Sequence, residues 1–217
     1  MLDNAGMDGT GRLLAAVLCC LALGGTALLA VPTAEAQCGG VEKARPAKKV
    51  APRPPLAIGD SVMLLALPNL ARKGFNVDAR GCRQFEEGLK LMIRKKREKR
   101  LPRLVVMALG ADAGISGKQV NRAKKIMGPK RKLGLVVPLE TGGGESNDAR
   151  VVRQAGRRDP RRVKVLDWPR YSRGHRNWFQ PDHLHLTFEG AAAYARLMAK
   201  LIPLADGGKK KGKGKRR

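Results

Sequence analysis

Residues 56–62, Leu-Ala-Ile-Gly-Asp-Ser-Val, contain the turn from which the fold can be worked out. The three apolar residues are typical of a short strand that is buried on both faces. Gly59 permits a tight exit from that strand, and Asp60-Ser61 precedes an apolar helical pattern, where Asp and Ser are common N-caps. We therefore predict a strand that turns directly into a helix, with Ser61 at the start of the helix.

The same alternation of short apolar runs and longer amphipathic stretches continues along the chain. Strands are predicted at 56–58, 75–77, 104–109, 133–137 and 163–166. Helices are predicted at 61–73, 84–99, 117–127, 146–157 and 188–202. This alternation indicates an α/β fold with a parallel sheet of about five strands between two layers of helices. In such a sheet, functional residues gather just beyond the carboxyl ends of the strands.

The N-terminus has the pattern of a secretory signal peptide. Residues 13–31 form one apolar run after Arg12, and Ala34 and Ala36 provide the small residues of a cleavage site. We predict a signal peptide over residues 1–36 with cleavage near Ala36. An uncleaved membrane anchor is the alternative, because the run is about long enough to span a bilayer. Either way, the remainder is expected to be secreted, periplasmic or associated with the cell wall.

The predicted mature chain, residues 37–217, has 181 residues, which is enough for one domain with its own core. We interpret the Pro- and Lys-rich residues 37–55 as a linker, residues 56–204 as the domain and residues 205–217 as a disordered basic tail. Cys38 and Cys82 are the two cysteines left after cleavage. In an oxidising compartment they favour one disulfide over two free thiols.

The charge of the chain indicates anionic partners. The formal net charge is +26, and it rises to +28 once Arg12 and the acids Asp3, Asp8 and Glu35 are removed. Such a charge favours acidic cell-wall polymers or anionic lipid headgroups, which the basic tail would contact. The chain has no basic motif interleaved with aromatic residues, so we do not expect nucleic acid as the partner.

A second segment with reactive side chains lies ahead of the last predicted helix, at residues 181–187, Pro-Asp-His-Leu-His-Leu-Thr. An activated serine needs a base, and the base needs an orienting carboxylate. Asp182 and His185 are three residues apart, so a turn can place both on one side, facing the strand ends. We therefore predict that they combine with Ser61.

Each of these features also has a plainer interpretation. Asp-Ser before an apolar helix is ordinary capping chemistry, so residues 60–61 alone do not decide between a nucleophile and a cap. His183 and His185 with Asp182, and with His175 nearby, have the chemistry of metal ligands. No second cluster of ligands exists elsewhere in the sequence, so we predict neither a metal nor an organic cofactor.

Two blocks of the sequence together resemble a known superfamily. Gly59-Asp60-Ser61 near the start and Asp182-x-x-His185-Leu186-Thr187-x-x-Gly190 near the end are similar to the motifs of the SGNH (GDSL) hydrolases. The resemblance is strongest to the SGNH domains associated with bacterial membrane O-acyltransferases, and it covers residues 56–202. Gly-Asp-Ser alone is weak evidence, but both blocks in this order and at this distance are specific.

The resemblance implies a three-layer α/β/α, flavodoxin-like fold with a Ser-His-Asp site. Ser61 would be the nucleophile, His185 the general base and then acid, and Asp182 the orienting carboxylate. The oxyanion hole would use backbone N–H groups of Ser61 and Gly81 and a third donor at residue 112.

The chain departs from the family at that third donor. Where the family has Gly-x-Asn, the sequence reads Gly110-Ala111-Asp112. An ionised Asp offers only acceptors, whereas Asn has an amide N–H to donate. In other enzymes the loss of one such donor lowers turnover on the order of 100- to 1000-fold.

These observations predict an exported serine esterase or O-acyltransferase that acts on acyl esters, acetyl esters above all, of a cell-surface glycan. The alternative is a catalytically silent module that binds anionic wall polymers. A membrane acyltransferase is a candidate partner. Trp168 and Trp178 flank the Asp182/His185 block and are expected to support that loop rather than to form a sugar platform.

Overall fold

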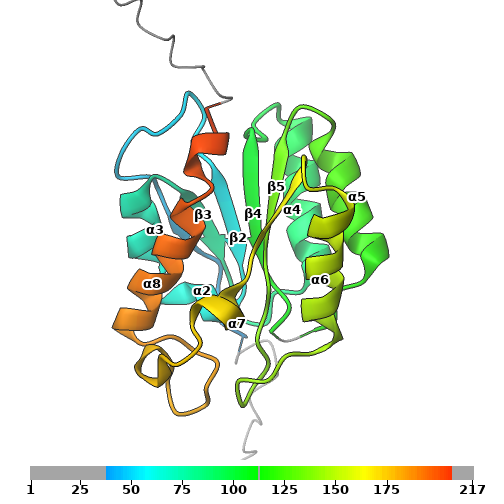
Figure 1. Ribbon diagram of the computed structural model, residues 1–217. Helices are drawn as coiled ribbons and strands as arrows, with labels where there is room; N and C mark the ends of the chain where they lie inside the picture. Colours follow the sequence, from blue (N-terminus) through cyan, green and yellow to red (C-terminus); the bar gives the residue numbers. More distant parts are fainter. Residues whose placement is uncertain (1–37, 112, 207–217) are drawn as a thin grey trace, which may run out of the picture. The chain divides into compact units, whose positions relative to one another are not determined.

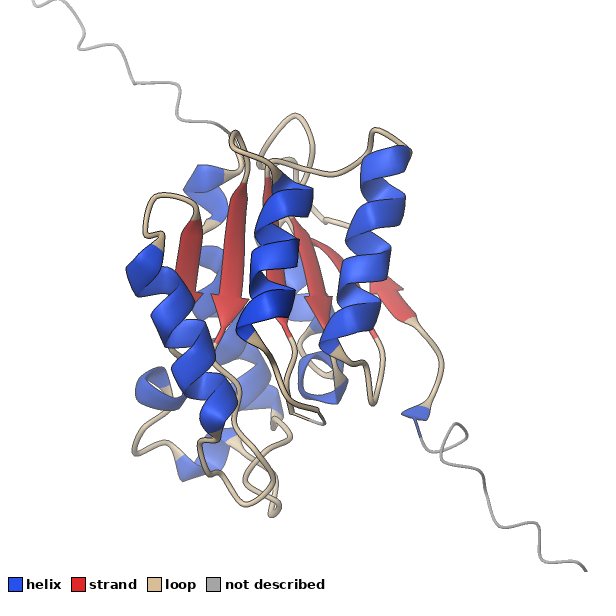
Figure 2. Cartoon of the chain, turned by 90° about the vertical axis from the view of Figure 1, so that its right-hand side faces the viewer, coloured by secondary structure: helices blue, strands red, loops and turns tan. Residues whose placement is uncertain are grey.

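The computed structural model describes residues 38–111 and 113–206. These residues form a six-stranded sheet between two layers of helices, as Figures 1 and 2 show. The predicted α/β class is thereby confirmed. None of the helices within these residues is long and apolar enough to cross a membrane. The predicted signal peptide, the tail beyond Asp206 and Asp112 lie outside the described residues.

The five parallel strands of the sheet have their carboxyl ends on one edge, where the reactive residues were expected. Its strands are β1 (Glu42–Ala44), β2 (Leu56–Gly59), β3 (Asn76–Ala79), β4 (Leu104–Ala108), β5 (Lys132–Val136) and β6 (Val163–Leu166). Their order in space is β1-β3-β2-β4-β5-β6, and every neighbouring pair is parallel except β1 with β3. The strand order reverses at β2, so the carboxyl end of β2 lies at the switch point where such sheets form binding crevices.

Helices cover both faces of this sheet. They are α2 (Ser61–Leu64), α3 (Leu67–Lys73), α4 (Phe85–Arg97), α5 (Gly117–Met127), α6 (Asn147–Arg158), α7 (Trp168–Tyr171) and α8 (Phe188–Ala199), with short 3-10 helices η1 (Arg176–Trp178) and η2 (Ile202–Leu204). The helices α3 and α8 pack on one face, and α4, α5 and α6 on the other (Figure 1).

The two layers have separate hydrophobic cores that meet at the sheet. Ala57 and Val106 belong to the cluster under α3 and α8, whereas Ile58 and Val105 belong to the cluster under α4 to α6. Successive strand residues point to opposite faces, so a strand that is apolar at every position fills both cores. This explains why the strands could be recognised as continuous apolar runs.

The structure differs from the prediction at the N-terminal side of the domain. Residues 42–44, interpreted as part of a linker, form β1 and pair with β3. This strand could not be recognised from its residues, because a short, charged edge strand pairs through its backbone and buries few side chains. The predicted disulfide is confirmed, since Cys38 is bonded to Cys82.

Three smaller differences from the prediction are local. The helix predicted at 61–73 is divided into α2 and α3, and Pro68 lies in the first turn of α3, where proline is tolerated. The short helix α7 was not predicted. At the other end, Ala205 is buried, so the domain extends into the first residue of the segment interpreted as the tail.

Candidate active site

Ser61 lies at the first position of α2, directly after the carboxyl end of β2. The N-cap of this helix is Asp60, whose side chain is buried and accepts hydrogen bonds from the backbone N–H groups of Val62 and Ala111, both at 3.2 Å. Asp60 therefore joins the Ser61 turn to the loop that follows β4. Because Asp60 acts as the cap, the hydroxyl of Ser61 is available for another partner.

That partner is His185, which is 124 residues away in the sequence. Nε2 of His185 lies 2.9 Å from Oγ of Ser61, and Nδ1 of His185 lies 2.5 Å from Oδ2 of Asp182. The structure thus brings together the three residues predicted for catalysis in one hydrogen-bonded chain. The order of the groups, hydroxyl to imidazole to carboxylate, is the arrangement that activates a serine nucleophile.

Asp182 also holds its own loop in shape. Its Oδ1 accepts hydrogen bonds from the backbone N–H groups of Leu184 and His185, each at 3.0 Å. Partial burial would raise the pKa of Asp182, but the hydrogen bonds from the His185 ring and from these two N–H groups lower the pKa below its usual range. An ionised Asp182 favours the His185 tautomer that carries its proton on Nδ1, which leaves the Nε2 lone pair facing Ser61.

The loop with Asp182 and His185 is tied to two neighbours. The backbone N–H of Gln180 donates to the His185 carbonyl at 2.7 Å, and the N–H of Gly142 in the β5–α6 loop donates to the Asp182 carbonyl at 2.9 Å. The terminal motif has a glycine at position 190 because a Cβ there would lie 1.9 Å from the carbonyl oxygen of Trp178. Only a glycine lets α8 begin this close to η1.

On the other side of the nucleophile, a buried arginine fixes the strand ends. Arg83 donates from Nη1 to the carbonyls of Gly59 and Asp78, at 3.3 and 2.6 Å, and Nη2 pairs with the Asp78 carboxylate at 2.7 Å. This role was not predicted from the sequence. One arginine in a chain of net charge +26 carries no signal that it is buried.

Of the residues predicted for the oxyanion hole, two can be placed. Ser61 begins α2, and the first N–H groups of a helix have no acceptor within the helix. Gly81 is buried in the turn after β3, where a Cβ would lie 2.4 Å from the carbonyl oxygen of Cys38, and the Cys38–Cys82 disulfide fixes that turn. The third, Asp112, lies outside the described residues.

Solved structures share this architecture. The chain superposes on the C-terminal catalytic domain of peptidoglycan O-acetyltransferase A (OatA) from Streptococcus pneumoniae with a TM-score of 0.62 and 24% identity, over 72% of this chain and 96% of that one. A "putative SGNH hydrolase" from Slackia heliotrinireducens gives a TM-score of 0.54 with 15% identity, over 68% of this chain and 97% of the other. The fold of the chain is therefore like that of the SGNH (GDSL) hydrolases.

By sequence, the chain is similar to part of several proteins named as O-acetyltransferases. It is 31% identical over 143 residues to "Putative O-acetyltransferase SAS0844" of Staphylococcus aureus strain MSSA476, covering 64% of this chain and 23% of that protein. It is 29% identical over 149 residues to peptidoglycan O-acetyltransferase OatA of Listeria monocytogenes, covering 68% and 24%. The chain therefore spans about a quarter of the length of these relatives. No protein-family model matches it.

The two tryptophans pack in the same hydrophobic cluster as residues of the His185 loop. Trp168 is buried and stacks on Trp178, with ring centroids 5.9 Å apart, and it makes a T-shaped contact with Tyr194, with ring centroids 4.9 Å apart. His175 stacks on the outer side of this group, 3.8 Å from Trp178 and inclined by 2°. His175 is thus part of the ring stack. Across the described residues, no three His, Cys, Asp or Glu side chains form a group that could hold a metal.

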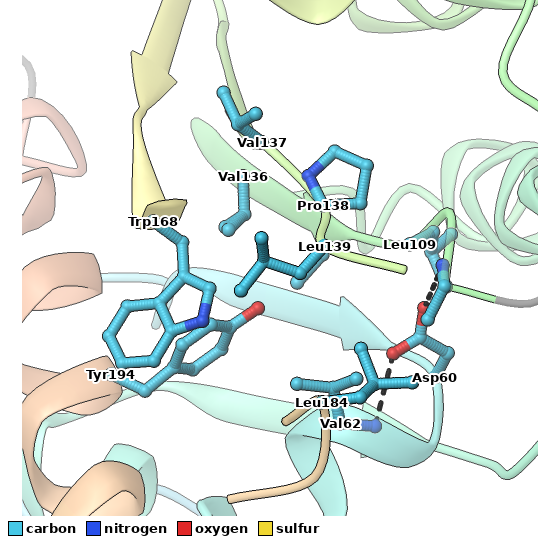
Figure 3. A pocket seen from close by; sticks show the side chains of 12 residues that line it. Asp60, Val62, Leu109, Val136, Val137, Pro138, Leu139, Trp168, Leu184 and Tyr194 are labelled. Carbon is cyan, nitrogen blue, oxygen red and sulfur yellow. Dashed lines mark hydrogen bonds between the residues drawn. The ribbon is translucent and has the colours of Figure 1, made fainter. Parts of the chain in front are cut away.

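A small pocket lies beneath the nucleophile turn, and Figure 3 shows the side chains that line it. Asp60, Leu184, Trp168 and Tyr194 contribute to its wall, which encloses room for about one water molecule. Burial, and then the negative charge of Asp60, raise the pKa of Tyr194 well above its usual value, so its phenol stays protonated. The pocket is too small for an acyl chain or a sugar.

Proposed function

We propose that this SGNH domain is an exported serine esterase or O-acyltransferase that acts on acyl esters, acetyl esters above all, of a cell-surface glycan. The observation that carries the proposal is the hydrogen-bonded chain from Ser61 through His185 to Asp182. The names of the O-acetyltransferase relatives support acetyl as the acyl group, and the name of the Listeria OatA supports a wall polymer as the substrate.

The reaction proceeds in two acyl-transfer steps. Oγ of Ser61 attacks the acyl carbonyl while Nε2 of His185 takes its proton, and the resulting imidazolium is stabilised by the ionised Asp182. His185 then returns the proton to the departing alcohol oxygen, which leaves an acyl-Ser61. Water or a sugar hydroxyl, deprotonated by His185, attacks this ester, and His185 returns that proton to Oγ of Ser61 as the acyl–Oγ bond breaks.

The backbone N–H groups of Ser61 and Gly81 and the side chain of Asp112 are the proposed surroundings of the oxyanion. An ionised carboxylate at residue 112 would repel the negative charge that develops in the transition state. Asp112 can donate a hydrogen bond only when it is protonated, which requires a strongly raised pKa. We therefore propose a slow enzyme whose rate rises when residue 112 is replaced by an amide.

The test is p-nitrophenyl acetate turnover by the wild type and by the Ser61→Ala and Asp112→Asn variants. We expect turnover that disappears in Ser61→Ala and increases on the order of 100-fold in Asp112→Asn. Reaction of Ser61 with a fluorophosphonate probe provides an independent check that does not depend on the ester chosen.

A second candidate function is a catalytically silent module that binds anionic wall polymers, and Asp112 is the residue that favours it. This alternative predicts no turnover and no fluorophosphonate labelling of Ser61 in either the wild type or Asp112→Asn. That pair of results would exclude the enzyme proposal.

Export and surface association complete the proposal. Residues 1–36 would be removed as a signal peptide, and N-terminal sequencing of the secreted protein tests whether it begins at Gln37. The positive charge would hold the protein near anionic wall polymers or membrane headgroups, and a membrane acyltransferase is its proposed protein partner.

A further inference from the structure

A second and larger pocket opens beside the Asp182–His185 loop. Its volume is about 380 Å³, and it lies between the β5–α6 loop and residues 169–183. His183, next to Asp182, lines it, and Leu139 lines both this pocket and the small one beneath the nucleophile turn. When a polymer presents an ester to Ser61, the units next to the ester-bearing unit can therefore reach this pocket.

Two arginines give the pocket its charge. Arg173 and Arg176 are exposed, line the pocket and have no acidic partner among residues 38–111 and 113–206. Glu145, which also lines the pocket, and the nearby Asp167 are both paired with Arg153. The hydrogen bond from Arg153 lowers the pKa of Glu145, so this carboxylate stays ionised and engaged with its own partner.

The backbone holds these two arginines on one short, well-anchored turn. Ser172 is buried and donates from Oγ to the carbonyl of Trp168 at 2.8 Å, and the N–H of His175 donates to the Ser172 carbonyl at 3.0 Å. Gly174 has φ +83°, a conformation that lets the turn reverse between Arg173 and His175. A fixed backbone reduces the conformational entropy that binding would otherwise cost.

The pocket also contains a flat ring. The exposed His175 lines the pocket, and its ring stacks on Trp178. This stack continues to the buried Trp168, so the imidazole is held in place by two rings behind it. A rigid ring beside guanidinium groups suits a ligand with an apolar ring face and an attached anion.

We infer that this pocket is a subsite for a carboxylate-bearing sugar of the substrate glycan, with Arg173 and Arg176 binding the carboxylate and His175 lying against the sugar ring. Guanidinium groups match a carboxylate in a two-point geometry. The ring contact favours a sugar acid over a flexible polyol phosphate, which has no flat face to place on His175. The inference rests on the proposed function, because it names the kind of glycan that carries the ester.

The kinetic test compares acetate release from acetylated oligogalacturonide with release from neutral acetylated xylo-oligosaccharide of equal length. The quantity compared is kcat/KM for the charged substrate divided by kcat/KM for the neutral one. In the Arg173→Gln/Arg176→Gln variant this ratio should fall by about 10-fold, mainly because the KM of the charged substrate rises. The matched control is Arg157→Gln/Arg158→Gln. It removes the same charge from the end of α6, at the opposite edge of the sheet. Equal changes of the ratio in both variants would overturn the subsite and leave only a general effect of charge.

A binding test separates this inference from the enzyme proposal. Calorimetric titration of unacetylated oligogalacturonide into the full Ser61→Ala protein requires no turnover. Binding that weakens about 10-fold in Arg173→Gln/Arg176→Gln and persists in the Arg157/Arg158 control supports the subsite even where no ester is cleaved. Binding that is equal in the two variants, or stronger for poly(glycerol phosphate) than for oligogalacturonide, overturns it.

Discussion

The two sides of the Ser61–His185 contact are built in different ways. On the nucleophile side, Asp60 and Arg83 are 3% and 6% exposed, and they join backbone groups at the ends of β2, β3 and β4. On the base side, the side chains of Asp182 and His185 are 35% and 37% exposed and lie on a loop. The position of the nucleophile therefore depends on the stability of the sheet, whereas that of the base depends on a few local hydrogen bonds. The two sides should respond differently to mutation.

The largest expected effect is on activity, from the base side. Asp182→Asn should lower kcat for an acetyl ester on the order of 10⁴-fold, because an amide group can hold His185 in the wrong tautomer. The free energy of unfolding should change by less than about 1 kcal/mol, since the loop is exposed and the amide oxygen can still accept the backbone hydrogen bonds. Ester kinetics and urea unfolding of the same preparation measure both effects, with Glu42→Gln on β1 as a control. If this variant were unfolded at room temperature, the base side would contribute as much to the stability of the fold as the nucleophile side.

The largest expected effect on stability comes from the nucleophile side. Arg83→Ala leaves the buried carboxylate of Asp78 without its ion-pair partner and should lower the free energy of unfolding by about 3–5 kcal/mol. The double variant Arg83→Met/Asp78→Leu removes both charges and should recover most of that loss. Urea unfolding compares the three proteins. A loss below about 1 kcal/mol in Arg83→Ala would contradict the role assigned to this arginine.

A smaller loss of stability is expected for Asp60→Asn. One Asp60 oxygen accepts from Val62 and the other from Ala111, so whichever way the amide is turned, its NH₂ group faces a backbone N–H. One buried backbone N–H group without a hydrogen-bond acceptor should lower the free energy of unfolding by about 1–3 kcal/mol. Asp60→Asn and Asp182→Asn are the same chemical change on the two sides. Thermal unfolding of the pair therefore tests the comparison directly, and equal stability losses would break it.

The smallest expected effect is on the pH dependence of stability. The pKa of Asp182 is lowered in the folded protein from its ordinary value of 3.8, so its ionised form contributes stability above that pH. The contribution is lost as the pH falls through the lower pKa of the folded state. Between about pH 4 and pH 2, the wild type should lose slightly more stability than Asp182→Asn. Acid unfolding curves of both proteins measure the difference, and parallel curves would show that the pKa of Asp182 is not lowered.

Much of the fold was present in the sequence. Five of the six strands were predicted because they are continuous apolar runs, and such runs need no knowledge of their neighbours to be recognised. The edge strand β1 and the helix α7 could not be predicted in this way. They are short, and their positions depend on pairing with β3 and on the packing of Trp168.

The sequence also determined which residues could form the site. Residue types, their order and their spacing singled out Ser61, Asp182 and His185, and the pair Asp182/His185 is close enough in sequence to be joined by one turn. The contact of His185 with Ser61 spans 124 residues, and only the parallel sheet, with α8 packed against α3, brings the two within 2.9 Å. The buried role of Arg83 and the pocket of Arg173 and Arg176 were likewise decided by the tertiary structure. In a strongly basic chain, an arginine acquires a role through its neighbours in space, and a sequence does not record them.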